Sequence, residues 1–154
     1  MTQRILIVDD DRLIHSALRS MLELRGYEVS VAADGWSGLK AIEADPFDLM
    51  VVDIFMPGMD GIETIRAVRR SRPELPILVM SGLHHGHAFA FASGLMPDFL
   101  TMAMEFGAVQ ALHKPFTPEE FLHAVETCLA KPPDDGRARA SAAVARAMGH
   151  TTPR

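Results

Sequence analysis

The stretch that decides the fold reads Ile5-Leu6-Ile7-Val8-Asp9-Asp10-Asp11, four apolar residues followed at once by three acids. The pattern returns at Leu49-Met50-Val51-Val52-Asp53, where a second apolar run ends on a carboxylate. Short continuous apolar runs are typical of strands that are buried on both faces of a sheet. Carboxylates gathered where such strands end repel one another unless a cation or a proton relieves the repulsion. We therefore expect two buried strands that bring acids to one edge of a sheet.

Strand and helix patterns alternate along the rest of the chain. Further strands are expected at residues 27–31, 76–80 and 109–112. A helix is expected after each of the first three strands, over residues 98–106, and after the fifth strand. Two helices carry clear start signals, because Asp60 precedes Glu63 and Thr117 precedes Glu120 at capping-box spacing. Five strand–helix units predict an α/β fold with a doubly wound, five-stranded parallel sheet and helices on both of its faces.

Length, charge and composition narrow the class of protein. A chain of 154 residues with a net charge of −5 fits one domain and disfavours binding to nucleic acid. The single cysteine, Cys128, cannot form an internal disulfide and fits a reducing compartment. No signal-peptide pattern is visible, and the uncharged residues 75–97 contain too many glycines and histidines for a membrane span. We expect a cytoplasmic protein with no membrane segment.

Two segments do not follow the strand–helix pattern. Residues 82–96 have no clean period and predict an extended loop within a compact domain of residues 1–130. Residues 131–154 predict a linker, rich in proline and aspartate, and a C-terminal tail that has the composition of a short helix with a mostly alanine face.

The expected site combines acids, a lysine and a hydroxyl at the carboxyl edge of the sheet. Asp10 and Asp53 offer hard oxygen ligands for Mg²⁺, and Lys114 and Ser81 offer a positive charge and a hydroxyl to phosphoryl oxygens. A carboxylate can also act as a nucleophile and carry a phosphoryl group. Taken alone, the acidic cluster is explained equally well as the start of a helix, and Asp11 is expected to serve only that purpose.

Four motifs, taken in order, closely resemble the receiver domain of two-component response regulators, of the chemotaxis-receiver type, over residues 4–130. The motifs are Ile7-Val8-Asp9-Asp10, Asp53-Ile54-Phe55-Met56-Pro57-Gly58-Met59-Asp60-Gly61, Met80-Ser81-Gly82 and Lys114-Pro115-Phe116. Their joint occurrence is specific, although any one of them alone would be weak. The resemblance implies a flavodoxin-like sheet with strand order 2-1-3-4-5.

The resemblance also implies the acceptor and the metal ligands. Asp53 would accept a phosphoryl group from a phosphohistidine on a histidine kinase or a histidine phosphotransfer protein. Asp10, Asp53 and the backbone carbonyl of Phe55 would bind Mg²⁺, and Asp9 would support the metal, often through water.

Further roles follow for the residues around the acceptor. Lys114 would pair with a phosphoryl oxygen, Ser81 would hydrogen-bond the phosphorylated form, and the peptide bond before Pro115 would be cis. The family often signals through an aromatic residue three positions before the lysine, but here that position is Ala111. The coupling from Ser81 to the outer face must therefore differ, and Phe89, Phe91, Phe99 or Phe106 are candidates to substitute.

Two apolar residues border the path that the resemblance assigns to the hydrolytic water. These are Phe55 and Leu83, each two positions after a site residue. Because neither side chain can position water, we predict slow self-dephosphorylation. The rest of the 82–96 loop leaves three readings open: a metal site at His84, His85 and His87, an apolar lid or partner surface at Phe89, Phe91, Leu95 and Met96, or incidental residues.

The sequence thus predicts a stand-alone, single-domain response regulator that works by protein–protein interaction in a magnesium-dependent phosphorelay. The first alternative is a pseudo-receiver, an interaction module that does not depend on phosphorylation. The second is an aspartyl-phosphate phosphatase, which we do not expect because Phe55 stands where such enzymes commonly carry a proton-transferring acid. The kinase, the downstream protein and the oligomeric state, including a homodimer, stay open.

Overall fold

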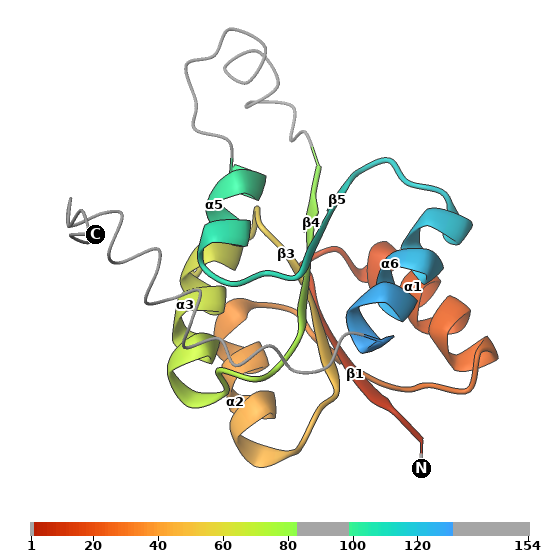
Figure 1. The fold of residues 1–154 in the computed structure, drawn as a ribbon, viewed down its shortest axis with the longest axis horizontal. Helices are drawn as coiled ribbons and strands as arrows, with labels where there is room; N and C mark the ends of the chain where they lie inside the picture. The colour runs from red at the N-terminus through yellow and green to blue at the C-terminus, as the bar shows by residue number, and fades with distance from the viewer. Residues whose placement is uncertain (1, 83–98, 131–154) are drawn as a thin grey trace, which may run out of the picture.

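The computed structural model describes residues 2–82 and 99–130, which contain a five-stranded parallel sheet with helices on both faces (Figure 1). The strands are β1 (Arg4–Val8), β2 (Glu28–Ala32), β3 (Leu49–Asp53), β4 (Ile77–Ser81) and β5 (Gln110–His113). The helices are α1 (Arg12–Leu24), α2 (Gly35–Ala44), α3 (Gly61–Ser71), α5 (Phe99–Glu105) and α6 (Pro118–Ala130). The strand order is β2-β1-β3-β4-β5, so the predicted fold class and strand order are both confirmed.

Alternate residues of each strand build two separate cores. On one face Leu6 and Val8 pack in a cluster covered by α2, α3 and α5. On the other face Ile5 and Ile7 pack in a cluster covered by α1 and α6. Figure 1 shows these helix groups on opposite sides of the strands. The central strands are buried on both faces, which explains why their sequences are continuous apolar runs rather than alternating ones.

The helices begin where the capping residues predicted them to begin. The Asp11 carboxylate accepts a hydrogen bond from Leu13 N, so this third acid of the cluster caps α1 as expected. Asp60 accepts from Glu63 N at the start of α3. At the start of α6, Thr117 and Glu120 exchange two hydrogen bonds, Thr117 N to Glu120 Oε2 at 3.0 Å and Glu120 N to Thr117 Oγ1 at 3.1 Å.

Three strands lie one residue later than the sequence pattern indicated. The expected ranges 27–31, 76–80 and 109–112 correspond to β2, β4 and β5, and β3 also extends by one residue to include Asp53. The reason is the hydrogen-bond ladder, which continues one residue past the predicted strand ends: Ala32 pairs in register with Val8, Asp53 with Met80, and Ser81 with His113. Asp53 and Ser81 are therefore the last residues of their strands rather than the first residues of loops.

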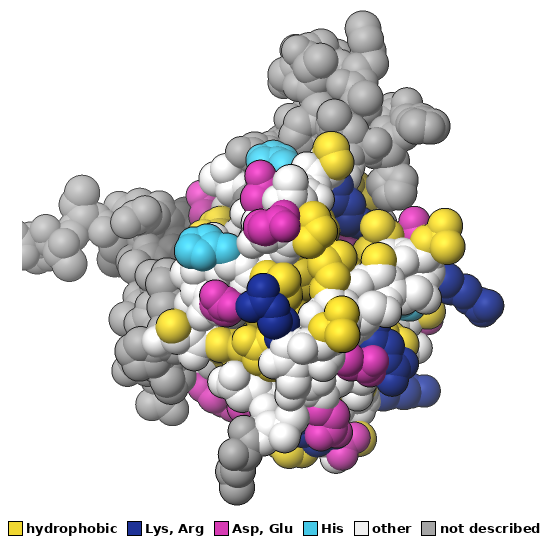
Figure 2. All heavy atoms as spheres, turned by 90° about the vertical axis from the view of Figure 1, so that its right-hand side faces the viewer, with side chains coloured by type: hydrophobic (Ala, Val, Ile, Leu, Met, Phe, Trp, Pro, Cys, Tyr) yellow, Lys and Arg dark blue, Asp and Glu magenta, His cyan; other side chains and the backbone are white. Residues whose placement is uncertain are grey.

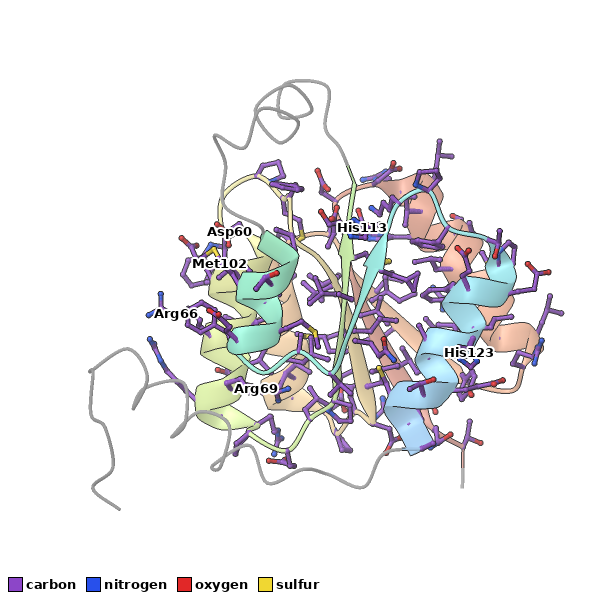
Figure 3. All side chains as sticks on the ribbon, turned by 45° about the horizontal axis from the view of Figure 1, so that its top comes forward. Asp60, Arg66, Arg69, Met102, His113 and His123 are labelled. Carbon is purple, nitrogen blue, oxygen red and sulfur yellow. The ribbon has the colours of Figure 1, made fainter. Side chains whose placement is uncertain are left out.

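An arginine from α3 holds the turns at the other end of the sheet. Arg69 Nη2 donates to the carbonyl of Gly107 at 2.6 Å, and Figure 3 shows Arg69 low on α3, far from the end of β5 that His113 marks. Among the described residues, no helix combines the length and apolar composition that a membrane span requires. The predictions for the 82–96 loop beyond Gly82, including Leu83, and for residues 131–154 lie outside the described residues.

Candidate functional site

The predicted site residues meet at the carboxyl edge of the sheet. Asp9 and Asp10 follow β1, Asp53 ends β3, Ser81 ends β4 and Lys114 follows β5. In Figure 3 this edge is marked by His113, which ends β5, and by Asp60, which caps α3. Because neighbouring parallel strands end at similar heights, residues far apart in the sequence become neighbours here.

Lys114 joins two strands through its ammonium group. Its Nζ lies 3.1 Å from Asp9 Oδ2 and 3.4 Å from Asp53 Oδ2. Both carboxylates are almost completely buried, with 0% of Asp9 and 2% of Asp53 exposed. A single cation therefore faces two buried acids, which leaves the group with a net negative charge in a poorly solvated place.

The pKa values of the pair reflect this arrangement. Burial raises the pKa of Asp53 to about 6, opposed by the positive charge of Lys114 and reinforced by the negative charge of Asp9. For Lys114, burial alone would lower the pKa, but the charges and hydrogen bonds of Asp53 and Asp9 outweigh it and raise the pKa. Lys114 is thus held as a cation, and Asp53 is mainly ionised near neutral pH but gains a proton more readily than an exposed carboxyl does.

Asp10 supplies the third carboxylate of the site. It is exposed, and one ligand oxygen from each of Asp9, Asp10 and Asp53 lies within 4.8 Å of the others. Three carboxylate oxygens in one place, one of them open to solvent, fit a hard divalent cation and leave room for water ligands. The described residues thus contain an acidic cluster that fits a metal ion.

Asp9 is more than the water-mediated support that the resemblance implied. Its Oδ1 accepts a hydrogen bond from Asp11 N at 2.9 Å, and its Oδ2 faces Lys114. Its own backbone N–H bonds to Ala32 O of β2. Asp9 therefore anchors the lysine and is fully buried, whereas Asp10 is exposed.

The start of α3 is pressed against the strand that carries Asp53. A Cβ atom placed on Gly61 would lie 2.4 Å from the carbonyl oxygen of Asp53, so only glycine permits this approach. Gly61 N also donates to the carbonyl of Ile54 at 2.8 Å. The sequence motif contains Gly61 but predicts no role for it; the signal in the sequence is a glycine directly after the helix cap Asp60 and close to the strand that carries Asp53.

A second close contact fixes Lys114 beside Ser81. The backbone N–H of Lys114 donates to Ser81 O at 2.7 Å, and a Cβ atom on Gly82 would lie 3.2 Å from Lys114 Cδ. The peptide bond between Lys114 and Pro115 is cis, as the resemblance implied. Ser81 is 7% exposed at the end of β4. These backbone contacts hold Lys114 next to the end of β4, the strand that ends with Ser81.

The atypical positions are only partly within the described residues. Ala111 is half-buried and packs against the cluster beneath α2, α3 and α5. Phe55 is half-buried, packs against the same cluster, and its N–H donates to Asp53 Oδ1 at 3.4 Å. Leu83 lies outside the described residues, so only one of the two predicted shielding groups can be placed.

Known proteins match this chain over most of its length. The response regulator receiver domain family matches residues 5–126. The response regulator MprA of Mycolicibacterium vanbaalenii is 37% identical over 143 residues, which cover 92% of this chain and 57% of that protein. MprA of Mycobacterium avium is 38% identical over 134 residues, which cover 86% of this chain and 54% of that protein. The chain thus spans about half the length of these curated relatives.

Solved structures agree with the sequence comparison. A CheY-like receiver domain protein from Methanospirillum hungatei has a TM-score of 0.73 at 30% identity, covering 84% of this chain and 94% of that one. The chemotaxis protein CheY4 of Vibrio cholerae has a TM-score of 0.72 at 30% identity, covering 84% of this chain and all of that one. With the sheet order, the acidic cluster and the lysine at its edge, these matches show that the chain belongs to the response regulator receiver domain family.

Proposed function

We propose that Asp53 accepts a phosphoryl group from a phosphohistidine on a histidine kinase or histidine phosphotransfer protein. The observation that carries this proposal is the contact of Lys114 Nζ with both Asp9 and Asp53 at the carboxyl edge. An Asp53 oxygen attacks phosphorus, the bond from phosphorus to the histidine nitrogen breaks, and the leaving imidazole retains the electron pair and takes up a proton. Lys114 then offsets charge on the transferred oxygens, and Ser81 donates a hydrogen bond to one of them.

We further propose that the acidic cluster binds Mg²⁺ through Asp10, Asp53 and the backbone carbonyl of Phe55, with Asp9 behind them. The cluster fits, because its three ligand oxygens lie within 4.8 Å of one another and are of the type that Mg²⁺ prefers. Bound Mg²⁺ would supply the positive charge that the attack of one anion on another requires. It would also favour the ionised form of Asp53, whose pKa burial raises to about 6.

The acyl phosphate is expected to be long-lived. Phe55 stands two residues after Asp53 and packs its apolar ring against the core cluster beneath α2, α3 and α5, and Leu83 holds the equivalent position after Ser81 in the sequence. Neither side chain can hydrogen-bond a water molecule for attack on phosphorus. Phe55→Asn and Leu83→Glu should each shorten the lifetime of the phosphorylated protein; an unchanged lifetime in both would contradict the shielding role.

The phosphodonor is proposed to dock over the first turn of α1 and the face that α1 shares with α6. Figure 2 shows apolar side chains gathered in the middle of this face. Leu13 is 81% exposed and stands two positions after Asp11, and Phe116 and Leu122 of the same face are only partly buried. An exposed leucine in the first turn of α1, close in sequence to Asp9 and Asp10, fits a protein partner rather than a small substrate.

Docking and chemistry can be separated with one variant. Leu13→Glu should slow phosphoryl transfer from a phosphorylated histidine phosphotransfer domain while leaving transfer from a small phosphodonor unchanged. Equal slowing with both donors would place Leu13 in the chemistry, and no slowing with either would remove the docking proposal.

We propose a non-enzymatic, cytoplasmic signalling role in which a downstream protein reads the phosphorylated state. Ala111 offers no ring to move, so the outer surface must change by another route, and a homodimer is one form that the output could take. The pseudo-receiver is the second candidate, and Ala111 is the observation that favours it. An aspartyl-phosphate phosphatase is disfavoured because Phe55 cannot transfer a proton.

The decisive experiment is a mass measurement of the intact chain after incubation with acetyl phosphate or phosphoramidate and Mg²⁺. We expect the mass of one phosphoryl group to be added to the wild-type chain and not to Asp53→Ala. No addition to the wild-type chain with either donor would favour the pseudo-receiver. Continuous release of phosphate over many turnovers would revive the phosphatase.

A further inference from the structure

A cavity lies at the amino edge of the sheet, opposite the acidic site. Its volume is about 300 Å³. Its walls come from the end of α2 and the segment that follows, from the segment before β4, and from the last turn of α6. Ile42, Phe47, Leu75 and Leu129 give it an apolar lining. None of these residues belongs to the phosphoryl site.

The polar residues that line the cavity are mainly acidic. Asp45, Asp48 and Glu74 outnumber Arg72 among the lining residues, and Arg4 adds a second cation nearby, with its guanidinium 5.1 Å from the centre of the Phe47 ring. Asp48 already accepts a hydrogen bond from Arg4 N at 2.8 Å, and Arg72 Nη2 donates to the carbonyl of Ile42 at 3.3 Å. Asp45 and Glu74 are exposed acids at this margin. The cavity therefore suits a ligand that combines small apolar groups with positive charge.

The chain itself carries such a segment, and it departs from the margin of the cavity. Leu129 lines the cavity, and α6 ends one residue later at Ala130. After the linker 131–136, residues 137–148 contain Arg137, Arg139 and Arg146, no acid, and mostly alanine with Val144 and Met148. An extended six-residue linker spans up to about 20 Å, so this segment can return to the cavity without crossing the molecule.

We propose that residues 137–148 bind in this cavity as an intramolecular ligand. The arginines lie against Asp45 and Glu74, and alanine, valine and methionine side chains enter the cavity beside Leu75 and Leu129. Tethering makes this contact effective even if it is weak, because the linker keeps the segment at high local concentration. The contact depends on charge at an exposed margin, so it weakens as salt is raised.

Limited digestion of the full chain with trypsin tests the proposal, because Arg137, Arg139 and Arg146 are themselves cleavage sites. In Asp45→Lys/Glu74→Lys, we expect cleavage after these arginines to be about tenfold faster than in the wild-type chain. The matched control Glu105→Lys/Glu119→Lys makes the same change in net charge away from the cavity and should cleave at the wild-type rate. Adding salt to the wild-type chain should move its rate toward that of the cavity variant.

A second measurement identifies the occupant. In the full chain, Arg137→Glu/Arg139→Glu/Arg146→Glu should shift the amide resonances of Ile42, Phe47 and Leu75 and leave those of Asp9 and Asp53 in place. Equal cleavage rates in the cavity and control variants, together with unshifted amides, would overturn the proposal. Protection that grows with protein concentration would also overturn it, since the occupant would then be a second copy of the chain.

Discussion

The two edges of the sheet handle charge in opposite ways. At the carboxyl edge, Asp9 and Asp53 are buried with 0% and 2% exposure and share the single cation Lys114. At the amino edge, Arg4 pairs with Glu28 at 3.2 Å with both side chains in contact with solvent, 27% and 57% exposed. Solvated pairs of the second kind cost the fold little, whereas buried acids in excess over their cation are costly. This contrast fits the proposed role of the carboxyl edge as a phosphoryl site that is kept at the expense of stability.

The largest effect should come from removing the shared cation. Lys114→Met leaves Asp9 and Asp53 buried without a counter-charge, and we expect it to lower the free energy of unfolding by about 3–5 kcal/mol in the absence of divalent cations. Urea denaturation near pH 7.5 measures this. The control is Lys40→Met, since Lys40 is an exposed lysine on α2. If the two substitutions cost the same, the buried acids do not depend on Lys114.

The pH dependence of stability should show the next largest effect. The pKa of Asp53 is about 6 in the folded chain, above its usual value near 4 in an unfolded one. Between these pH values the folded state holds a proton that the unfolded state has lost, so this residue makes stability fall as pH rises from about 4 to 6, by up to about 3 kcal/mol. The loss persists above that window.

Subtracting the curve of Asp53→Asn from that of the wild-type chain isolates this residue from all other titrating groups. The difference should change between about pH 4 and pH 6 and be flat at higher pH. A flat difference over the whole range would mean that burial does not raise the pKa of Asp53.

The sequence alone predicts much of the contrast between the two edges of the sheet. The apolar runs that end in Asp9, Asp10 and Asp53 predict buried strands and acids at one edge, and the capping residues Asp60 and Thr117 predict where two helices start. These features are local, since they depend on residues next to each other in the chain.

The features that the sequence left open depend on contacts between distant segments. Nothing near Asp9 in the chain indicates that it faces Lys114, and nothing near Gly61 indicates how closely α3 approaches β3. The strand ends were predicted one residue early because apolar periodicity stops at Val52 and Met80, while the hydrogen-bond ladder continues into Asp53 and Ser81. The roles of Leu83, the 82–96 loop and the tail stay predictions, because they lie outside the described residues.

Addition of Mg²⁺ should raise the free energy of unfolding, by less than the loss of Lys114 lowers it. At ten times its dissociation constant, Mg²⁺ should stabilise the wild-type chain by about 1.4 kcal/mol, because it binds the folded acids. In the Asp10→Asn variant, thermal unfolding should show that most of this stabilisation by Mg²⁺ is lost. The control is Asp11→Asn, which keeps an N-cap residue on α1 and removes the same charge one position away. Equal losses would mean that the gain is not specific to the cluster.

The smallest effect is expected at the amino edge. Glu28→Gln should lower the free energy of unfolding by no more than about 1 kcal/mol, because it removes only the solvated pair with Arg4 and leaves the other contacts of Arg4 in place. Added salt should reduce this difference further. A loss as large as that from Lys114→Met, measured by the same urea denaturation, would remove the contrast between the edges.

The most direct test compares the wild-type chain with Asp53→Asn, with and without Mg²⁺, near pH 7.5. Without Mg²⁺, Asp53→Asn should have the higher free energy of unfolding, because it removes one of two buried acids that share one lysine. Saturating Mg²⁺ should stabilise only the wild-type chain appreciably and so narrow or reverse the difference. A less stable Asp53→Asn in the absence of Mg²⁺, or an equal gain from Mg²⁺ in both proteins, would contradict the account.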